Sequence, residues 1–111
     1  MAELGDNGDD GAHASVATDL QSDGVPVIRI DGELDISNVS AIEQECDVVV
    51  KQSPGRVVFD LATLRFIDSS GIAMLLRAAQ SSEVEVRNAS NMIRRIIAAT
   101  GLTDVLHVEH D

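Results

Sequence analysis

Aromatic side chains are almost absent from this chain of 111 residues, which has two Phe, no Tyr and no Trp. Proteins that bind single-stranded nucleic acid stack bases on aromatic rings and attract the phosphates with Lys and Arg. Positive charge is also scarce, because eight Lys plus Arg stand against 19 Asp plus Glu, a formal net charge of −11. We therefore expect no direct binding of nucleic acid.

Cysteine and long apolar runs are scarce as well. The single cysteine, Cys46, excludes an internal disulfide and a multi-cysteine metal site, which is typical of a reducing compartment. No run of about 18 apolar residues is available to span a bilayer, so no membrane insertion is expected. The first residues, MAELGDNGDDGAH, are acidic, whereas a signal peptide starts with basic residues and continues with apolar ones. These features predict a cytoplasmic protein.

The negative charge is concentrated near the start of the chain. Residues 1–24 contain six acidic residues and no Lys or Arg. Residues 1–14 are rich in glycine and have little to bury, which predicts a disordered acidic tail. Such a tail either keeps the protein soluble or selects a partner, and the sequence leaves both roles open. Residues 15–111 are long enough to form a single domain with one core.

Alternating apolar and polar residues predict two strands near the start of this domain, Ser15–Gln21 and Val25–Ile30. Residues 22–24 are turn formers, so the two strands are expected to form an antiparallel hairpin. Pro26 should stand at the start of its strand because it has no N–H to donate. Residues 31–35 are polar and are expected to turn. Three later strands are predicted at Arg56–Leu61, Glu83–Arg87 and Val105–Val108.

Apolar residues spaced by three and four predict a helix that places Cys46 on its buried face. A small buried side chain is the favoured role for this cysteine, ahead of a reactive thiol. The helix start has two candidate arrangements. Ser37 or Asn38 could cap it, or Ser40 and Glu43 could form a capping box.

Two more helices are predicted, one after Asp68 and one that begins at Ser90 or Asn91 and ends before Gly101. Short strand–helix–strand units imply right-handed crossovers and parallel neighbouring strands. The order β-β-α-β-α-β-α-β therefore predicts an α/β fold. We expect a mixed sheet, made of the N-terminal antiparallel hairpin and parallel βαβ units, with helices packed against it.

The motif Asp68-Ser69-Ser70-Gly71 places two hydroxyl groups at the start of the second helix, directly after a strand. Free backbone N–H groups point out of a helix N-terminus, and the helix dipole favours an anion there. The fold would therefore tolerate a phosphate on a serine at this point. The alternative is that Asp68 or Ser69 serves only as the helix cap, and both interpretations can hold together.

A serine hydrolase would use the same residues in another way. Its nucleophile elbow requires glycine two residues before the serine, where this chain has Ile67 or Asp68. The three histidines, His13, His107 and His110, lie in the tail and near the C-terminus, so no general base is evident. We expect neither an enzyme nor a metal or cofactor site.

The segment VVFDLATLRFIDSSGIAMLLRAA, preceded by IRIDGELD and followed by VRNASNMIRRIIAATGL, resembles the STAS domain of bacterial anti-sigma factor antagonists. The likeness covers roughly residues 15–108. It implies a protein that is not an enzyme but binds an anti-sigma factor and so releases the sigma factor. It also implies that this partner is a serine kinase with a histidine-kinase-like ATPase domain, which switches the antagonist off by phosphorylating Ser69. A serine phosphatase would reverse the modification.

The resemblance further implies a partner-binding surface made of two neighbouring segments, with the residues Gly32, Glu33, Asp35, Asp68, Ser69, Ser70 and Gly71. If the segments lie close together, a phosphate on Ser69 joins the negative charges of Glu33, Asp35 and Asp68. STAS-like proteins also act as accessory or scaffold subunits of membrane transporters and sensory complexes, without phosphorylation. That role is the alternative, and the oligomeric state is left open.

Overall fold

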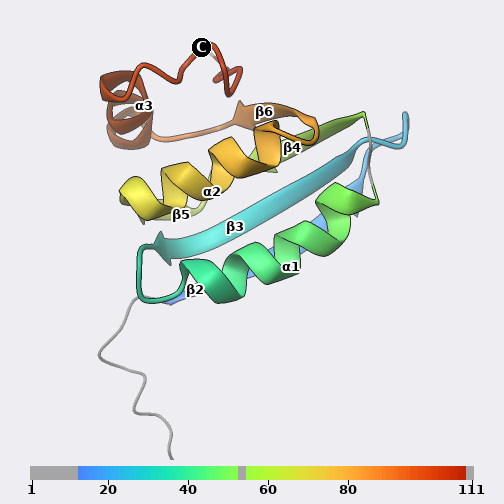
Figure 1. Ribbon diagram of the computed structural model, residues 1–111, viewed down its shortest axis with the longest axis horizontal. Coiled ribbons are helices and arrows are strands. Elements are labelled where there is room, and N and C mark those ends of the chain that lie inside the picture. The colour runs from blue at the N-terminus through green and yellow to red at the C-terminus, as the bar shows by residue number, and fades with distance from the viewer. Residues whose placement is uncertain (1–12, 53–54, 110–111) are drawn as a thin grey trace, which may run out of the picture.

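The computed structural model describes residues 13–52 and 55–109, which form a mixed sheet with three helices (Figure 1). Most of the predicted tail, residues 1–12, lies outside the described residues. Ala14, which was expected to end the tail, already belongs to the first strand. No helix of the described part is long and apolar enough to cross a membrane.

The sheet is organised around its longest strand, β3. The hairpin strand β2 pairs antiparallel with one side of β3. On the other side of β3, residues 27–29 pair parallel with β4 and residues 32–34 pair parallel with β5. Strand β6 adds to β4, again in parallel. The mixed sheet and its N-terminal hairpin are thus confirmed, and Pro26 opens its strand as expected. The strands are β2 (Ala14–Leu20), β3 (Pro26–Leu34), β4 (Arg56–Asp60), β5 (Leu64–Ile67) and β6 (Glu83–Arg87).

Two parts of the predicted strand order are wrong. Residues 31–34 continue β3 instead of turning, because their polar side chains lie on the solvent face of the sheet and β5, a strand that was not predicted, pairs with their backbone. Residues 105–108 form turns instead of a strand. The segment meets the sheet at one isolated parallel bridge between Val108 and Val86, in which the Val86 N–H donates to the His107 carbonyl at 3.3 Å and the Glu109 N–H donates to the Val86 carbonyl at 2.9 Å. Before the bridge, the backbone makes turn bonds instead, such as that from the Leu106 N–H to the Leu102 carbonyl at 3.0 Å.

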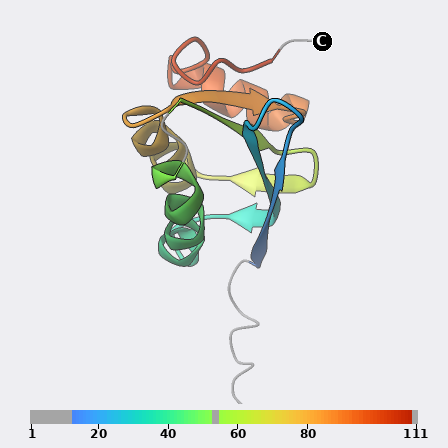
Figure 2. The same cartoon turned by 90° about the vertical axis from the view of Figure 1, so that its right-hand side faces the viewer.

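Helices α1 (Val39–Lys51) and α2 (Ser69–Ala79) cover one face of the sheet, and α3 (Asn91–Ala99) packs next to β5 (Figure 2). The core lies between the sheet and α1 and α2, and extends under α3. Burial of apolar area supplies most of its stabilisation. Its fully buried side chains include Ile28, Ile30, Leu34, Phe59, Leu61, Ile67, Leu75, Ile93, Ile97 and Leu106.

No helix of the described residues covers the other face of the sheet, and charged side chains occupy it. Arg65 Nε lies 2.9 Å from Glu33 Oε2, and Arg87 Nε lies 2.7 Å from Glu85 Oε2. Arg56 also pairs with Glu85. Each such exposed pair contributes about 1 kcal/mol or less to stability. Their main consequence is a sheet face that can remain in water.

Cys46 is buried in α1, as predicted, and burial raises the pKa of its thiol to about 12. The capping box predicted at the start of α1 is wrong, because both carboxylate oxygens of Glu43 accept hydrogen bonds from Arg77 of α2 at 2.7 and 2.8 Å. Asn38 occupies the cap position, but its amide donates backwards to the Glu33 carbonyl at 2.8 Å. The pair Glu43–Arg77 therefore joins the two helices.

Candidate functional site

The carboxylate of Asp68 holds the first turn of α2. Its Oδ1 accepts hydrogen bonds from the Ser70 N–H at 2.9 Å, the Gly71 N–H at 3.2 Å and the Ser70 hydroxyl at 2.5 Å. Asp68 is thus the N-cap, one of the two caps that the motif allowed. The hydroxyl of Ser70 is committed to this cap.

The second oxygen of Asp68 connects α2 to the segment that follows β3. Oδ2 accepts a hydrogen bond from the Ile36 N–H at 3.1 Å, and the Asp68 N–H donates to the Leu34 carbonyl at 3.2 Å. Strands β3 and β5 are parallel, so their carboxyl ends meet at the same edge of the sheet. The two predicted segments are therefore neighbours, although Gly32 and Glu33 belong to the strand itself.

The hydrogen bonds around Asp68 set its charge state. Partial burial raises the pKa of this carboxyl, but donation by the Ser70 hydroxyl and by the N–H groups of Gly71, Ile36 and Ser70 outweighs burial. The net result is a pKa below the ordinary value of 3.8. Because the charged form is favoured in the folded state, it stabilises the fold above the ordinary pKa. This contribution is lost as pH falls through the folded-state pKa.

Replacing Asp68 with Asn tests this charge. At neutral pH we expect the free energy of unfolding to fall by about 0.5–1 kcal/mol, because the carboxylate interacts with the helix dipole more strongly than an amide does. The difference from wild type should shrink in acid, below the ordinary value of 3.8, where Asp68 becomes neutral. Urea unfolding over a pH series measures it. A difference that stays constant with pH would contradict the assignment.

Ser69 differs from both of its neighbours. It is the first residue of α2, its side chain is exposed, and its hydroxyl has no hydrogen-bond partner among residues 13–52 and 55–109. Asp68 and Ser70, in contrast, are half-buried and bonded to each other. A modifying enzyme could therefore reach Ser69 without breaking the cap.

Gly71 lets α2 lie close to the sheet. A Cβ at this position would come 2.6 Å from Cγ1 of Ile67 and 3.1 Å from Cδ2 of Leu34, two fully buried side chains. The first distance is shorter than real Cβ contacts and the second is tighter than most of them, so a larger residue would push the start of α2 away from β3 and β5. Gly71 therefore fixes where Ser69 is presented.

The acidic residues predicted for this surface have different surroundings. Hydrogen bonding by Arg65 holds the pKa of Glu33 below its usual value, and the ion pair offsets the charge of Glu33. Asp35 Oδ1 accepts from the Ser37 N–H at 2.8 Å and from the Ser37 hydroxyl at 2.5 Å. The Asp35–Ser37 turn thus lies directly beside Asp68, whereas Glu33 is directed to Arg65.

Ile36 also lies at this edge, although it was not among the site residues predicted from the sequence. Its side chain is 75% exposed, and its backbone is fixed between the Asp35–Ser37 turn and the carboxylate of Asp68. An exposed apolar side chain held on an ordered turn is available for burial against a protein partner. The available signal was one apolar residue in the stretch Asp35–Asn38 that belongs to no strand or helix pattern.

Comparison with known proteins agrees with this architecture. The family model described as the STAS domain matches residues 17–111. The anti-sigma-F factor antagonist RsfB of Mycobacterium tuberculosis is 32% identical over 83 residues, which are 71% of this chain and 68% of that protein. An anti-sigma-B factor antagonist of Staphylococcus aureus is 26% identical over 73% of this chain and 80% of its own.

A solved structure has the same fold. The crystal structure of an anti-sigma factor antagonist from Mycobacterium paratuberculosis matches with a TM-score of 0.76 and 28% identity, over 89% of this chain and 87% of that one. Together with the family match, this likeness confirms the resemblance inferred from the Asp68–Gly71 motif and its flanking segments. The chain belongs to the STAS domain family.

Proposed function

We propose that this protein is an anti-sigma factor antagonist, which binds an anti-sigma factor and thereby frees the sigma factor. The names of the relatives in Mycobacterium and Staphylococcus support this role. The binding surface is the sheet edge where the Asp35–Ser37 turn meets the start of α2. This edge combines an exposed apolar side chain, Ile36, with an exposed hydroxyl, that of Ser69.

We further propose that phosphorylation of Ser69 switches the protein off. The observation that carries this proposal is the Ser69 hydroxyl, which is exposed and has no hydrogen-bond partner among the described residues, while Asp68 and Ser70 on either side of it are hydrogen-bonded to each other. The kinase is the anti-sigma factor itself, through a histidine-kinase-like ATPase domain. The γ-phosphoryl group of ATP passes to Oγ of Ser69, the hydroxyl proton is released and ADP leaves. A serine phosphatase hydrolyses the phosphoserine.

The phosphate acts on binding and leaves the fold intact. It adds about −1.5 to −2 charges at the position where the partner contacts a neutral hydroxyl. Asp68 and Asp35 already make this edge negative, so the added charge increases repulsion and adds bulk. The helix N-terminus tolerates the phosphate in the free protein, because its N–H groups and dipole favour an anion.

Ile36→Ser tests the apolar part of the surface. We expect it to weaken binding of the anti-sigma factor by about tenfold, because a buried anchor of this size contributes roughly 1.5 kcal/mol. Thermal stability should be unchanged, since the side chain is exposed. Val48→Ser is the matched control, because Val48 is 58% exposed on α1, outside this edge. Isothermal titration with the purified partner measures both, and equal effects would contradict the proposed surface.

A further inference from the structure

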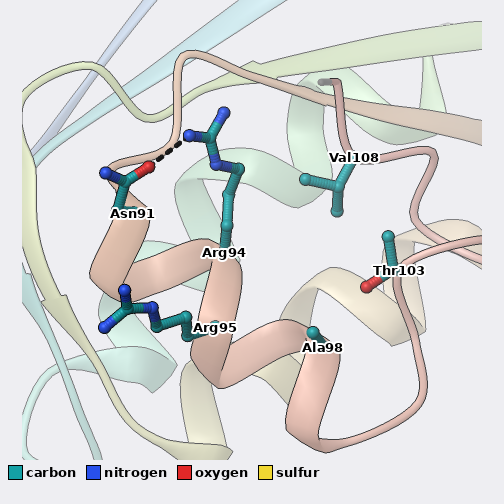
Figure 3. Close-up of a pocket in the computed structure, with 6 residues that line it drawn as sticks. All are labelled: Asn91, Arg94, Arg95, Ala98, Thr103 and Val108. Atoms are coloured by element: carbon teal, nitrogen blue, oxygen red, sulfur yellow. Dashed lines mark hydrogen bonds between the residues drawn. The ribbon is translucent and has the colours of Figure 1, made fainter. Parts of the chain in front are cut away.

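A cavity of about 390 Å³ lies between α3 and the segment that returns to the sheet at Val108 (Figure 3). Asn91, Arg94, Arg95 and Ala98 line it from the helix, and Thr103 and Val108 line it from the returning segment. Figure 3 shows Arg94 beside Asn91, with Val108 and Thr103 across from the helix. The volume of the cavity is typical of a small-molecule site, and none of its lining residues belongs to the sheet edge that carries Ser69.

The cavity is positively charged within a strongly negative protein. Among residues 13–52 and 55–109, its lining has two arginines and no carboxylate. Residues 86–103 contain no Asp or Glu, and this is the longest such stretch in a chain with 19 acidic residues. The acids that flank the stretch, Glu85 and Asp104, do not line the cavity. Glu109, further along the chain, is also absent from the described lining and acts electrostatically on Arg87.

Arg95, on α3, differs from the ion-paired arginines elsewhere in the described structure. Arg29, Arg56, Arg65, Arg77 and Arg87 each form an ion pair with Asp or Glu. Arg95 has no carboxylate within 4.0 Å in the described part of the chain, and Arg94 donates to the side-chain oxygen of Asn91. Guanidinium groups bind phosphate and carboxylate groups in a bidentate manner. Arg95 therefore has the capacity to bind an anion from solution.

We propose that this cavity binds a small organic anion. Arg94 and Arg95 bind its phosphate or carboxylate group, Thr103 and Asn91 add hydrogen bonds, and its apolar body packs against Ala98 and Val108. The cavity size favours a small molecule over a peptide segment. Phosphate and carboxylate groups would be bound by the same contacts, and a titration with one ligand of each kind distinguishes them. The proposal does not depend on the function of Ser69.

NMR amide spectra of the full chain, titrated at constant ionic strength, test the site. The probes are inorganic phosphate, phenyl phosphate and benzoate. We expect saturable shifts confined to residues 91–98 and 103–108, with phenyl phosphate binding about tenfold more tightly than inorganic phosphate because its ring is buried. Phenyl phosphate and benzoate together show which anionic group is preferred.

Arg95→Gln and Arg94→Gln should each weaken this binding by about tenfold, the loss of one charge-assisted contact. Arg29→Gln is the control, because Arg29 pairs with Asp31 on the uncovered face of the sheet. The amide spectrum reports whether each variant is folded, and Arg95 is exposed, so at least this substitution should be tolerated. Shifts that do not saturate, that spread over the surface or that survive both substitutions would overturn the proposal. Equal affinity for inorganic and phenyl phosphate would also overturn it.

Discussion

Ser69→Asp is expected to weaken binding of the anti-sigma factor by about 100-fold or more, whereas Ser69→Ala should bind like the wild type. An unpaired charge forced into an interface costs about 2–5 kcal/mol, and a 100-fold loss corresponds to about 2.7 kcal/mol, within this range. Alanine removes only a hydroxyl that has no partner within the described residues. Titration of the purified partner with each variant measures the difference.

Stability separates this effect from unfolding. The Ser69 side chain is exposed and Asp68 keeps the cap, so thermal unfolding of Ser69→Asp should match that of the wild type. Ser22→Asp is the control for the added charge, because Ser22 is exposed in the β2–β3 turn, at the opposite end of β3. It should bind normally. If Ser69→Asp binds as tightly as Ser22→Asp, the proposed switch is wrong.

Gly32→Ala is expected to lower the free energy of unfolding by about 3 kcal/mol, and the melting temperature by about 15 °C. Two causes add together. Gly32 has a φ of +99°, which favours glycine, and a Cβ there would lie 2.0 Å from the carbonyl oxygen of His13. That oxygen is backbone and accepts the Glu33 N–H at 2.9 Å, so the start of β2 would have to move.

Gly24→Ala isolates the steric part of this cost. Gly24 also has a positive φ, +85°, but a Cβ there would meet nothing within 4 Å. Gly24→Ala should therefore lower the free energy of unfolding by about 1 kcal/mol, which is the conformational penalty alone. Chemical unfolding of both variants gives the comparison. Equal destabilisation would mean that the contact with His13 does not constrain β3.

Local patterns predicted the elements whose own residues determine their structure. Helices α2 and α3 begin at the caps Asp68 and Ser90, and β6 has the predicted bounds. Strand β5 was missed because Arg65 and Phe66, at its centre, are both exposed and leave no alternation to detect. Its structure comes from pairing with β3, whose partner residues stand 32 or 33 positions earlier in the chain.

The candidate site divides in the same way. The Asp68–Gly71 motif could be found because its cap bonds join residues two or three positions apart. The contacts of Asp68 with Ile36 and of Arg65 with Glu33 join residues 32 positions apart. No local pattern encodes such contacts, so the hydrogen bond between Ile36 and Asp68 and the pairing of Glu33 with Arg65 became visible only in the folded chain.

The most direct test of the account is to map the phosphate after incubation with the anti-sigma factor and ATP. The wild type and Ser69→Ala are each used to capture the anti-sigma factor from native cells. Each complex is then incubated with ATP and cleaved with trypsin. Cleavage after Arg65 and Arg77 places Ser69 and Ser70 in one peptide, in which fragment masses distinguish the two serines. We predict phosphate on Ser69 of the wild type and none on Ser69→Ala. Phosphate on another residue, or capture of transporter subunits regardless of residue 69, would contradict the account.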